Sequence, residues 1–114
     1  MASSIRIKRL NNTYLEEISM IIMRDVKDEV IKNAVITAVD VTNDLSYAKV
    51  YFTVFDKNIK EEVLEALNNA SKFIRTELAD RIEIRHTPEL RFIYDESEEY
   101  GEKIDKIIDN LEKK

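Results

Sequence analysis

The chain of 114 residues contains no cysteine and no tryptophan, and only one histidine, one glycine and one proline. Without cysteine it has neither disulfides nor thiolate metal ligands, which is typical of a reducing compartment. A single histidine cannot form a metal-binding histidine cluster, so we expect no metal, and we expect no cofactor either. No apolar run approaches the ~20 residues of a membrane span, and the first four residues lack the apolar core of a signal peptide. These absences favour a cytoplasmic protein.

Charge is the next constraint on function. The net charge is −5 and the sequence pI is about 5.0, which excludes a strongly basic nucleic-acid-binding protein. The acids are concentrated at the end: from Asp95 onward there are eight acids and four bases, whereas residues 1–94 carry 15 acids and 14 bases. Arg6, Lys8 and Arg9 lie in the first ten residues, which contain no acid. A local basic face is therefore compatible with the composition.

The length predicts one domain spanning residues 1–114. Apolar residues at steps of three and four predict a helix from about Ser4 to Arg24, capped by Ser3 or Ser4. β-branched residues over 34–42 and strict alternation over 47–54 predict an antiparallel hairpin, because Asn and Asp in the intervening residues 43–46 tolerate turn geometry.

A corner between two helices is the expected centre of function. A capping box at Asn58 and Glu61 predicts the first helix, which we expect to end near residue 67. Asn and Ser in 68–71 compete with the helical backbone for hydrogen bonds, so a second helix is expected from about Ser71 to residue 79. A helix start exposes N–H groups that favour anions. Since Lys72 and Arg75 lie beside it, we expect this corner to contact a phosphate backbone.

The last third of the chain completes the order α-β-β-α-α-β-α. Residues 87–88, Thr-Pro, are expected to be extended, and 90–94 to form a third strand parallel to the second, joined by the helical crossover. An acidic helix is expected over about 97–111, with one apolar side, followed by a frayed tail at 112–114. The apolar side comprises Tyr100, Ile104, Ile107, Ile108 and Leu111.

Three motifs in this order resemble those of the ribosome-binding factor A family, which has a type II KH-like fold. The segment 43–51 resembles the hairpin motif, 73–75 the motif after the corner, and 85–92 with Asp95 and Ser97 the third-strand motif. The resemblance runs from about residue 6 to residue 111. KH domains usually bind RNA through a Gly-x-x-Gly loop, and this family has an Ala-x-Gly corner instead. Here Ala70 is kept and Lys72 stands where glycine is usual.

The resemblance implies an α+β, type II KH-like domain with a three-stranded sheet and helices on one face. It implies a non-enzymatic factor that binds the immature small (30S) ribosomal subunit, contacts its 16S ribosomal RNA, assists late processing of that RNA and supports growth in the cold. Ribosomal proteins and other assembly factors, including a GTPase, are implied partners. We expect a monomer. The alternative is a KH-like protein-interaction adaptor that does not bind RNA directly.

The expected RNA-binding residues come from three places in the sequence. Arg6, Lys8 and Arg9 are cations at a helix start, where they oppose the helix dipole and so suggest an external anionic partner. The other interpretation is an ordinary helix start whose charges are solvated. At the corner, Lys72 and Arg75 either contact RNA or belong to a solvated helix face. His86 is interpreted first as a partly buried hydrogen-bonding residue, and Arg85 as the better RNA candidate. The full set is Arg6, Lys8, Arg9, Asn69, Ala70, Ser71, Lys72, Arg75, Arg85 and His86.

Two further groups of residues have structural and functional interpretations. Tyr47 and Tyr51 either pack under the first helix or stack on bases, and packing is favoured because aromatics at strand spacing usually belong to a core. Asp40, Asp44 and Asp95 suggest a carboxylate site only if the fold gathers them. No nucleophile–base pair or phosphate-binding glycine loop is present, so the sequence does not predict an enzyme.

Overall fold

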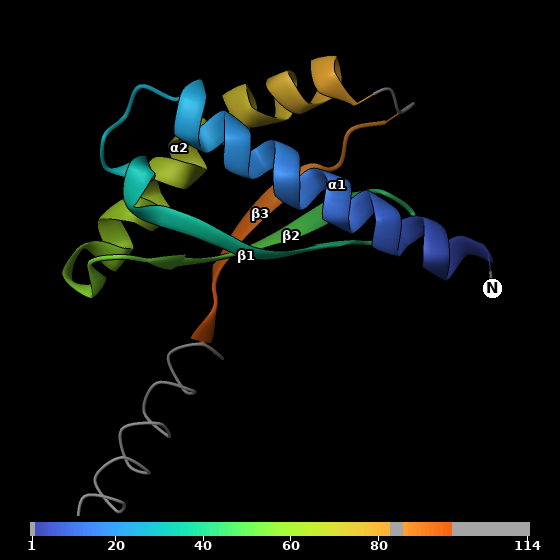
Figure 1. Ribbon diagram of the computed structural model, residues 1–114, viewed down its shortest axis with the longest axis horizontal. Coiled ribbons are helices and arrows are strands. Elements are labelled where there is room, and N and C mark those ends of the chain that lie inside the picture. The colour runs from blue at the N-terminus through green and yellow to red at the C-terminus, as the bar shows by residue number, and fades with distance from the viewer. Residues whose placement is uncertain (1, 83–85, 97–114) are drawn as a thin grey trace, which may run out of the picture.

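The computed structural model describes residues 2–82 and 86–96. Its elements are the helix α1 (Ala2–Arg24), a one-turn 3-10 helix η1 (Ile31–Asn33), the strands β1 (Ala34–Val41) and β2 (Tyr47–Val54), a second 3-10 turn η2 (Lys57–Ile59), the helix α2 (Lys60–Arg81) and the strand β3 (Glu89–Tyr94). Both α-helices lie over one face of the sheet (Figure 1). The expected helix over 97–111 and the tail 112–114 lie outside the described residues.

The sheet has the order β1-β2-β3. β1 and β2 are antiparallel and β3 is parallel to β2, so the predicted hairpin and third strand are both confirmed. In the hairpin turn Leu45 takes a φ of 61°, and the Asp44 carboxylate accepts hydrogen bonds from the Ser46 N–H (3.0 Å) and the Thr42 hydroxyl (2.8 Å). These side-chain bonds hold a turn that has no glycine.

One continuous helix replaces the expected corner. α2 covers Lys60–Arg81, although its ribbon changes direction near the middle (Figure 1). Ser71 lies inside the helix, where its hydroxyl donates to the Asn68 carbonyl at 2.9 Å. Buried Leu67 and Ile74 lie on either side of this stretch. Burying such a side chain stabilises by about 1.5–3 kcal/mol, whereas an unfavourable residue costs at most about 0.7 kcal/mol in a helix interior, so packing outweighs the local preference.

Both predicted helix caps are wrong. α1 begins at Ala2, so Ser3 and Ser4 lie inside the helix. Before α2, Asp56 accepts a hydrogen bond from the Asn58 N–H at 3.0 Å, and a 3-10 turn comes between this bond and the start of the α-helix. The aspartate therefore takes the place that the sequence pattern assigned to Asn58, because its carboxylate is a strong acceptor for the free N–H groups of a helical start.

Helices pack on one face of the sheet and not on the other in the described part of the chain. Side chains of one face pack with α1 and α2 into the core, which includes Tyr14, Ile18, Ile21, Val39, Ala48, Val50, Phe52, Val63, Leu67, Ile74, Leu78, Leu90 and Phe92. The other face, here called the open face, is covered by no helix in the described part of the chain. It carries Tyr47 and Tyr51, whose predicted packing under the first helix is wrong, because strand alternation turns them away from Val50 and the helices.

Candidate nucleic-acid interface

The first turns of α1 carry a group of exposed cations. Arg6, Lys8 and Arg9 are all exposed, and the first turn of the helix contains no acid. Arg6 and Arg9 are three residues apart and therefore neighbours on the helix surface. This end of α1 projects beyond the sheet (Figure 1). Within the described residues none of the three has an ion-pair partner, so these cations are available to an anion outside the domain.

The middle of α2 presents one exposed cation among small polar residues. Asn69 and Lys72 are exposed, Ser71 is half-buried, and Ala70 packs partly against the core. Because α2 is unbroken here, its backbone N–H groups are used within the helix and do not form the anion-binding helix start that the corner hypothesis required. An anion at this place would meet the Lys72 ammonium and the Asn69 amide, not a helix terminus.

Arg75 has a partner inside the domain. Its guanidinium is half-buried and donates to the Thr87 carbonyl from Nε (3.1 Å) and from Nη2 (2.6 Å). The following residue, Pro88, is fully buried. Arg75 therefore fixes the segment before β3 against α2. RNA contact by Arg75 stays a prediction, and no pattern in the sequence signals this internal contact, which joins residues twelve positions apart.

The segment before β3 differs from its predicted environment. His86 is exposed, where the sequence suggested a partly buried residue. Pro88 is the buried anchor of the segment, so the chain enters the core two residues after His86. Since Arg75 holds the adjacent Thr87 to α2, His86 lies near the same helix. Arg85 lies outside the described residues.

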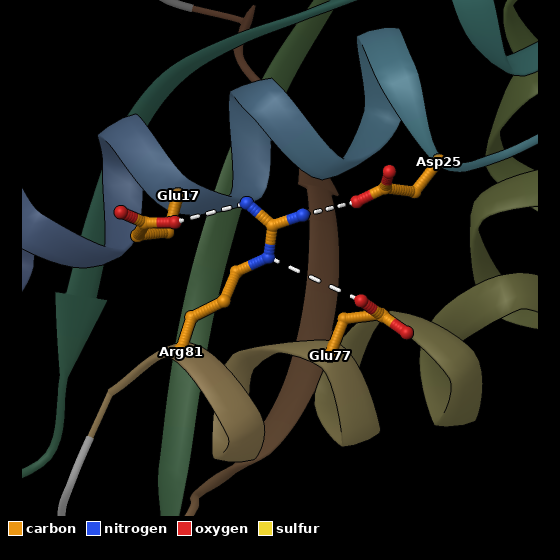
Figure 2. A network of polar contacts seen from close by, with 4 residues as sticks. All are labelled: Glu17, Asp25, Glu77 and Arg81. Atoms are coloured by element: carbon orange, nitrogen blue, oxygen red, sulfur yellow. Dashed lines mark hydrogen bonds and ion pairs between the residues drawn. The ribbon is translucent and has the colours of Figure 1, made fainter.

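The structure does not bring all the predicted cations together. The start of α1 projects away from the middle of α2 (Figure 1). Near the other end of α1 three carboxylates surround one cation: Arg81 of α2 contacts Asp25, Glu17 (3.4 Å) and Glu77 (4.0 Å), each about 30% exposed (Figure 2). This network was not predicted, since Glu17 and Arg81 are 64 positions apart. It fastens α2 to α1, and it leaves Arg81 paired with carboxylates rather than available to phosphate.

The three aspartates considered as a carboxylate site serve the local structure. Hydrogen bonds from Ser46 and Thr42 lower the pKa of Asp44 to about 2. Asp95 accepts a hydrogen bond from the Thr37 hydroxyl at 2.7 Å, and Asp40 lies opposite Lys49 across the hairpin. Among the described residues no group of three or more His, Cys, Asp or Glu side chains gathers to hold a metal. Nor is any described helix long and apolar enough to cross a membrane.

Comparison with known proteins connects this geometry to a family. The family profile of ribosome-binding factor A matches residues 6–108. The chain belongs to the ribosome-binding factor A family. It is 48% identical over 108 residues to ribosome-binding factor A of Clostridium tetani, covering 93% of this chain and 89% of the relative. It is 47% identical over 114 residues to that of Staphylococcus carnosus, covering 98% of each chain.

Solved structures of the same family share the fold. The crystal structure of ribosome-binding factor A from Thermus thermophilus has a TM-score of 0.70 at 24% identity, covering 77% of this chain and 94% of that one. A homology model of the Thermus thermophilus factor, fitted into the cryo-EM map of a 30S–RbfA complex, has a TM-score of 0.64 at 24% identity, covering 75% and 91%. The described domain is thus an α+β, KH-like fold.

Proposed function

We propose that the protein binds the small (30S) ribosomal subunit, contacts its 16S ribosomal RNA directly and assists the late maturation of that RNA. Membership of the ribosome-binding factor A family carries this proposal. A structural neighbour fitted into a 30S complex supports the choice of partner. The exposed cations supply the chemistry, because Lys and Arg side chains bind phosphate oxygens.

The start of α1 is the first proposed contact. Arg6, Lys8 and Arg9 project from a helix end that the sheet does not cover, so a phosphate backbone can approach them without moving the core. Lys72 on α2, with Asn69 and Ser71 beside it, is the second contact. His86 lies near α2, through the bond between Arg75 and Thr87, and extends that contact. Ala70 contributes a small side chain that permits close approach.

Charge reversal at the start of α1 tests the first contact. We expect Arg6→Glu/Arg9→Glu to bind immature small subunits at least about tenfold more weakly, a loss of about 1.4 kcal/mol in binding free energy. The measurement is co-sedimentation at fixed magnesium with increasing protein concentration. Lys27→Glu/Lys32→Glu is the matched control, because it removes the same charge from two exposed cations elsewhere and should change the affinity less than twofold.

Lys72→Glu tests the second contact in the same assay. A weakening comparable with that of the α1 variant would support two separate contacts with RNA. The adaptor function, in which ribosomal protein rather than RNA is bound, predicts another pattern: both charge-reversal variants would then sediment with subunits as the wild type does. Failure of the wild-type protein to bind any ribosomal particle would refute the proposed function itself.

A further inference from the structure

Arg75 joins two segments that each carry part of the second proposed contact. Its guanidinium donates to the Thr87 carbonyl from Nε at 3.1 Å and from Nη2 at 2.6 Å. On α2, the exposed Lys72 lies one helical turn before Arg75. In the segment before β3, the exposed His86 comes directly before Thr87. The bond between Arg75 and Thr87 therefore determines where His86 lies relative to Lys72.

The segment 86–88 has few other ways to be held against α2. Pro88 is fully buried, but it has no N–H and cannot donate a backbone bond. The Glu89 N–H donates to the Ser46 carbonyl at 3.0 Å, which ties the chain to the sheet and not to α2. In the described part of the chain, no other hydrogen bond joins residues 86–88 to α2. The distance of the segment from this helix thus depends on Arg75.

The surroundings of Arg75 fit an internal role. The side chain is half-buried, and among the described residues it has no carboxylate within ion-pair distance. Its Nε–Nη2 edge, which could bind a phosphate through two parallel bonds, faces the neutral carbonyl instead. Burial raises the pKa of Tyr14 and the Arg75 charge partly offsets this rise, so the guanidinium also lies near α1. Arg75 therefore lies where α1, α2 and the segment before β3 meet.

We propose that Arg75 is a positioning residue, which holds His86 beside Lys72 so that both side chains reach the same stretch of RNA. Arg75 itself does not contact the RNA. The proposal rests on the proposed function, because it assigns a role within the second contact. His86 supplies a hydrogen bond and Lys72 a phosphate contact. Loss of Arg75 then removes the contribution of His86 and leaves that of Lys72.

A double-mutant cycle in the full-length protein tests this coupling, with co-sedimentation of immature small subunits as the measurement. We expect His86→Ala to weaken binding about fivefold in the wild type, as the loss of one hydrogen bond does. In Arg75→Met, the same change should weaken binding by less than about twofold more, because the imidazole no longer has a fixed place. Lys72→Met should weaken binding by a similar factor in both backgrounds.

Arg81→Met is the matched control for lost stability. It also removes an arginine from α2, together with contacts that hold the domain, but Arg81 does not touch the segment before β3. At a temperature where circular dichroism shows every variant folded, His86→Ala should keep its full effect in Arg81→Met. The proposal is wrong if His86→Ala keeps that effect in Arg75→Met, or if it has no effect in the wild type.

The salt dependence of binding distinguishes positioning from direct contact. A cation on a phosphate contributes about 0.7–0.9 to the slope of log affinity against log salt. Because Arg75 is proposed not to contact phosphate, Arg75→Met should keep the wild-type slope while binding more weakly. A slope that is shallower by about 0.7–0.9 would instead make Arg75 an RNA ligand and overturn the proposal.

Nuclear magnetic resonance of the free protein tests the positioning without RNA. We expect the backbone amides of His86 and Thr87 to have order parameters near the roughly 0.85 of a rigid backbone in the wild type, and to fall clearly below it in Arg75→Met. Unchanged order parameters would show that Arg75 does not hold the segment. If the wild type bound no ribosomal particle, the proposed function would fail, whereas the order parameters would still show whether Arg75 fixes the segment.

Discussion

Tyr14 shows how a single buried atom affects stability. Its side chain is fully buried, and its hydroxyl, with that of Tyr94, is one of two buried side-chain polar atoms without a hydrogen-bond partner in the described part of the chain. An unpaired buried hydroxyl costs about 1–3 kcal/mol of desolvation. We therefore expect Tyr14→Phe to raise the free energy of unfolding by about 1 kcal/mol, measured by urea denaturation at neutral pH. A clear loss of stability would show that the hydroxyl is satisfied.

The same residue predicts a pH dependence. Burial raises the pKa of Tyr14 to about 12 from 10.0, partly offset by the nearby Arg75 charge. A raised pKa in the folded state gives stability that is complete below pH 10 and is lost as the pH rises towards 12. A difference of two pH units between the folded and unfolded pKa corresponds to about 2.7 kcal/mol of unfolding free energy. Tyr14→Phe should lack this part of the loss of stability at alkaline pH. If the unfolding free energies of the wild type and Tyr14→Phe depended on pH in the same way, the prediction would be contradicted.

Arg75 is the residue for which an internal role and an RNA role can be separated. Arg75→Met keeps the aliphatic stem but leaves the Thr87 carbonyl without its two donors, so we expect a loss of about 1–3 kcal/mol in unfolding free energy. Lys72→Met, one helical turn earlier and exposed, should change stability by less than about 0.5 kcal/mol. Subunit binding at a temperature where both variants are folded then shows whether Arg75 also contacts RNA.

At the scale of elements, α2 shows where local preference fails. Asn68, Asn69 and Ser71 disfavour helix, yet they lie on its exposed or half-buried side while Leu67 and Ile74 hold the other side in the core. The hairpin and β3 were predictable because a period of two in the sequence directly gives the buried and exposed faces of a strand. Helix continuity depends on packing against α1 and β3, which composition alone does not reveal.

Lys72→Gly tests the continuity of α2. The family resemblance implies glycine at this position, but in an unbroken helix glycine costs about 0.5–1 kcal/mol relative to alanine. We expect Lys72→Gly to unfold that much more easily than Lys72→Ala in urea, with a small loss of helical circular dichroism. Equal stability of the two variants would contradict an unbroken helix and would favour the corner that the sequence predicted at residues 68–71.

At the scale of the whole molecule, the sequence identified the family and the fold but not the arrangement of the site. The exposed cations Arg6, Lys8, Arg9 and Lys72 were all candidates from the sequence. Their separation into two groups, and the use of Arg75 and Arg81 in holding the domain together, depend on contacts between residues far apart in the chain. Such contacts leave no periodic pattern in a single sequence, so only the folded chain distinguishes a binding cation from a structural one.

A small number of separated phosphate contacts has a measurable consequence for a protein of net charge −5. Each contact contributes about −0.7 to −0.9 to the slope of log affinity against log salt. Four contacts, from Arg6, Lys8, Arg9 and Lys72, therefore predict a slope between about −2.8 and −3.6 for subunit binding. The measurement is a series of binding curves at increasing monovalent salt and constant magnesium.

Neutral substitutions decide which cations produce this slope. Arg6→Gln/Arg9→Gln removes two contacts and should make the slope shallower by about 1.4–1.8, whereas Lys27→Gln/Lys32→Gln should leave it unchanged. The slope separates direct phosphate contact from an indirect loss of affinity, because a variant that is merely less stable binds more weakly at every salt concentration without a change of slope. If Arg6→Gln/Arg9→Gln kept the wild-type slope, the start of α1 would not contact RNA, and the protein would reach the subunit through another surface.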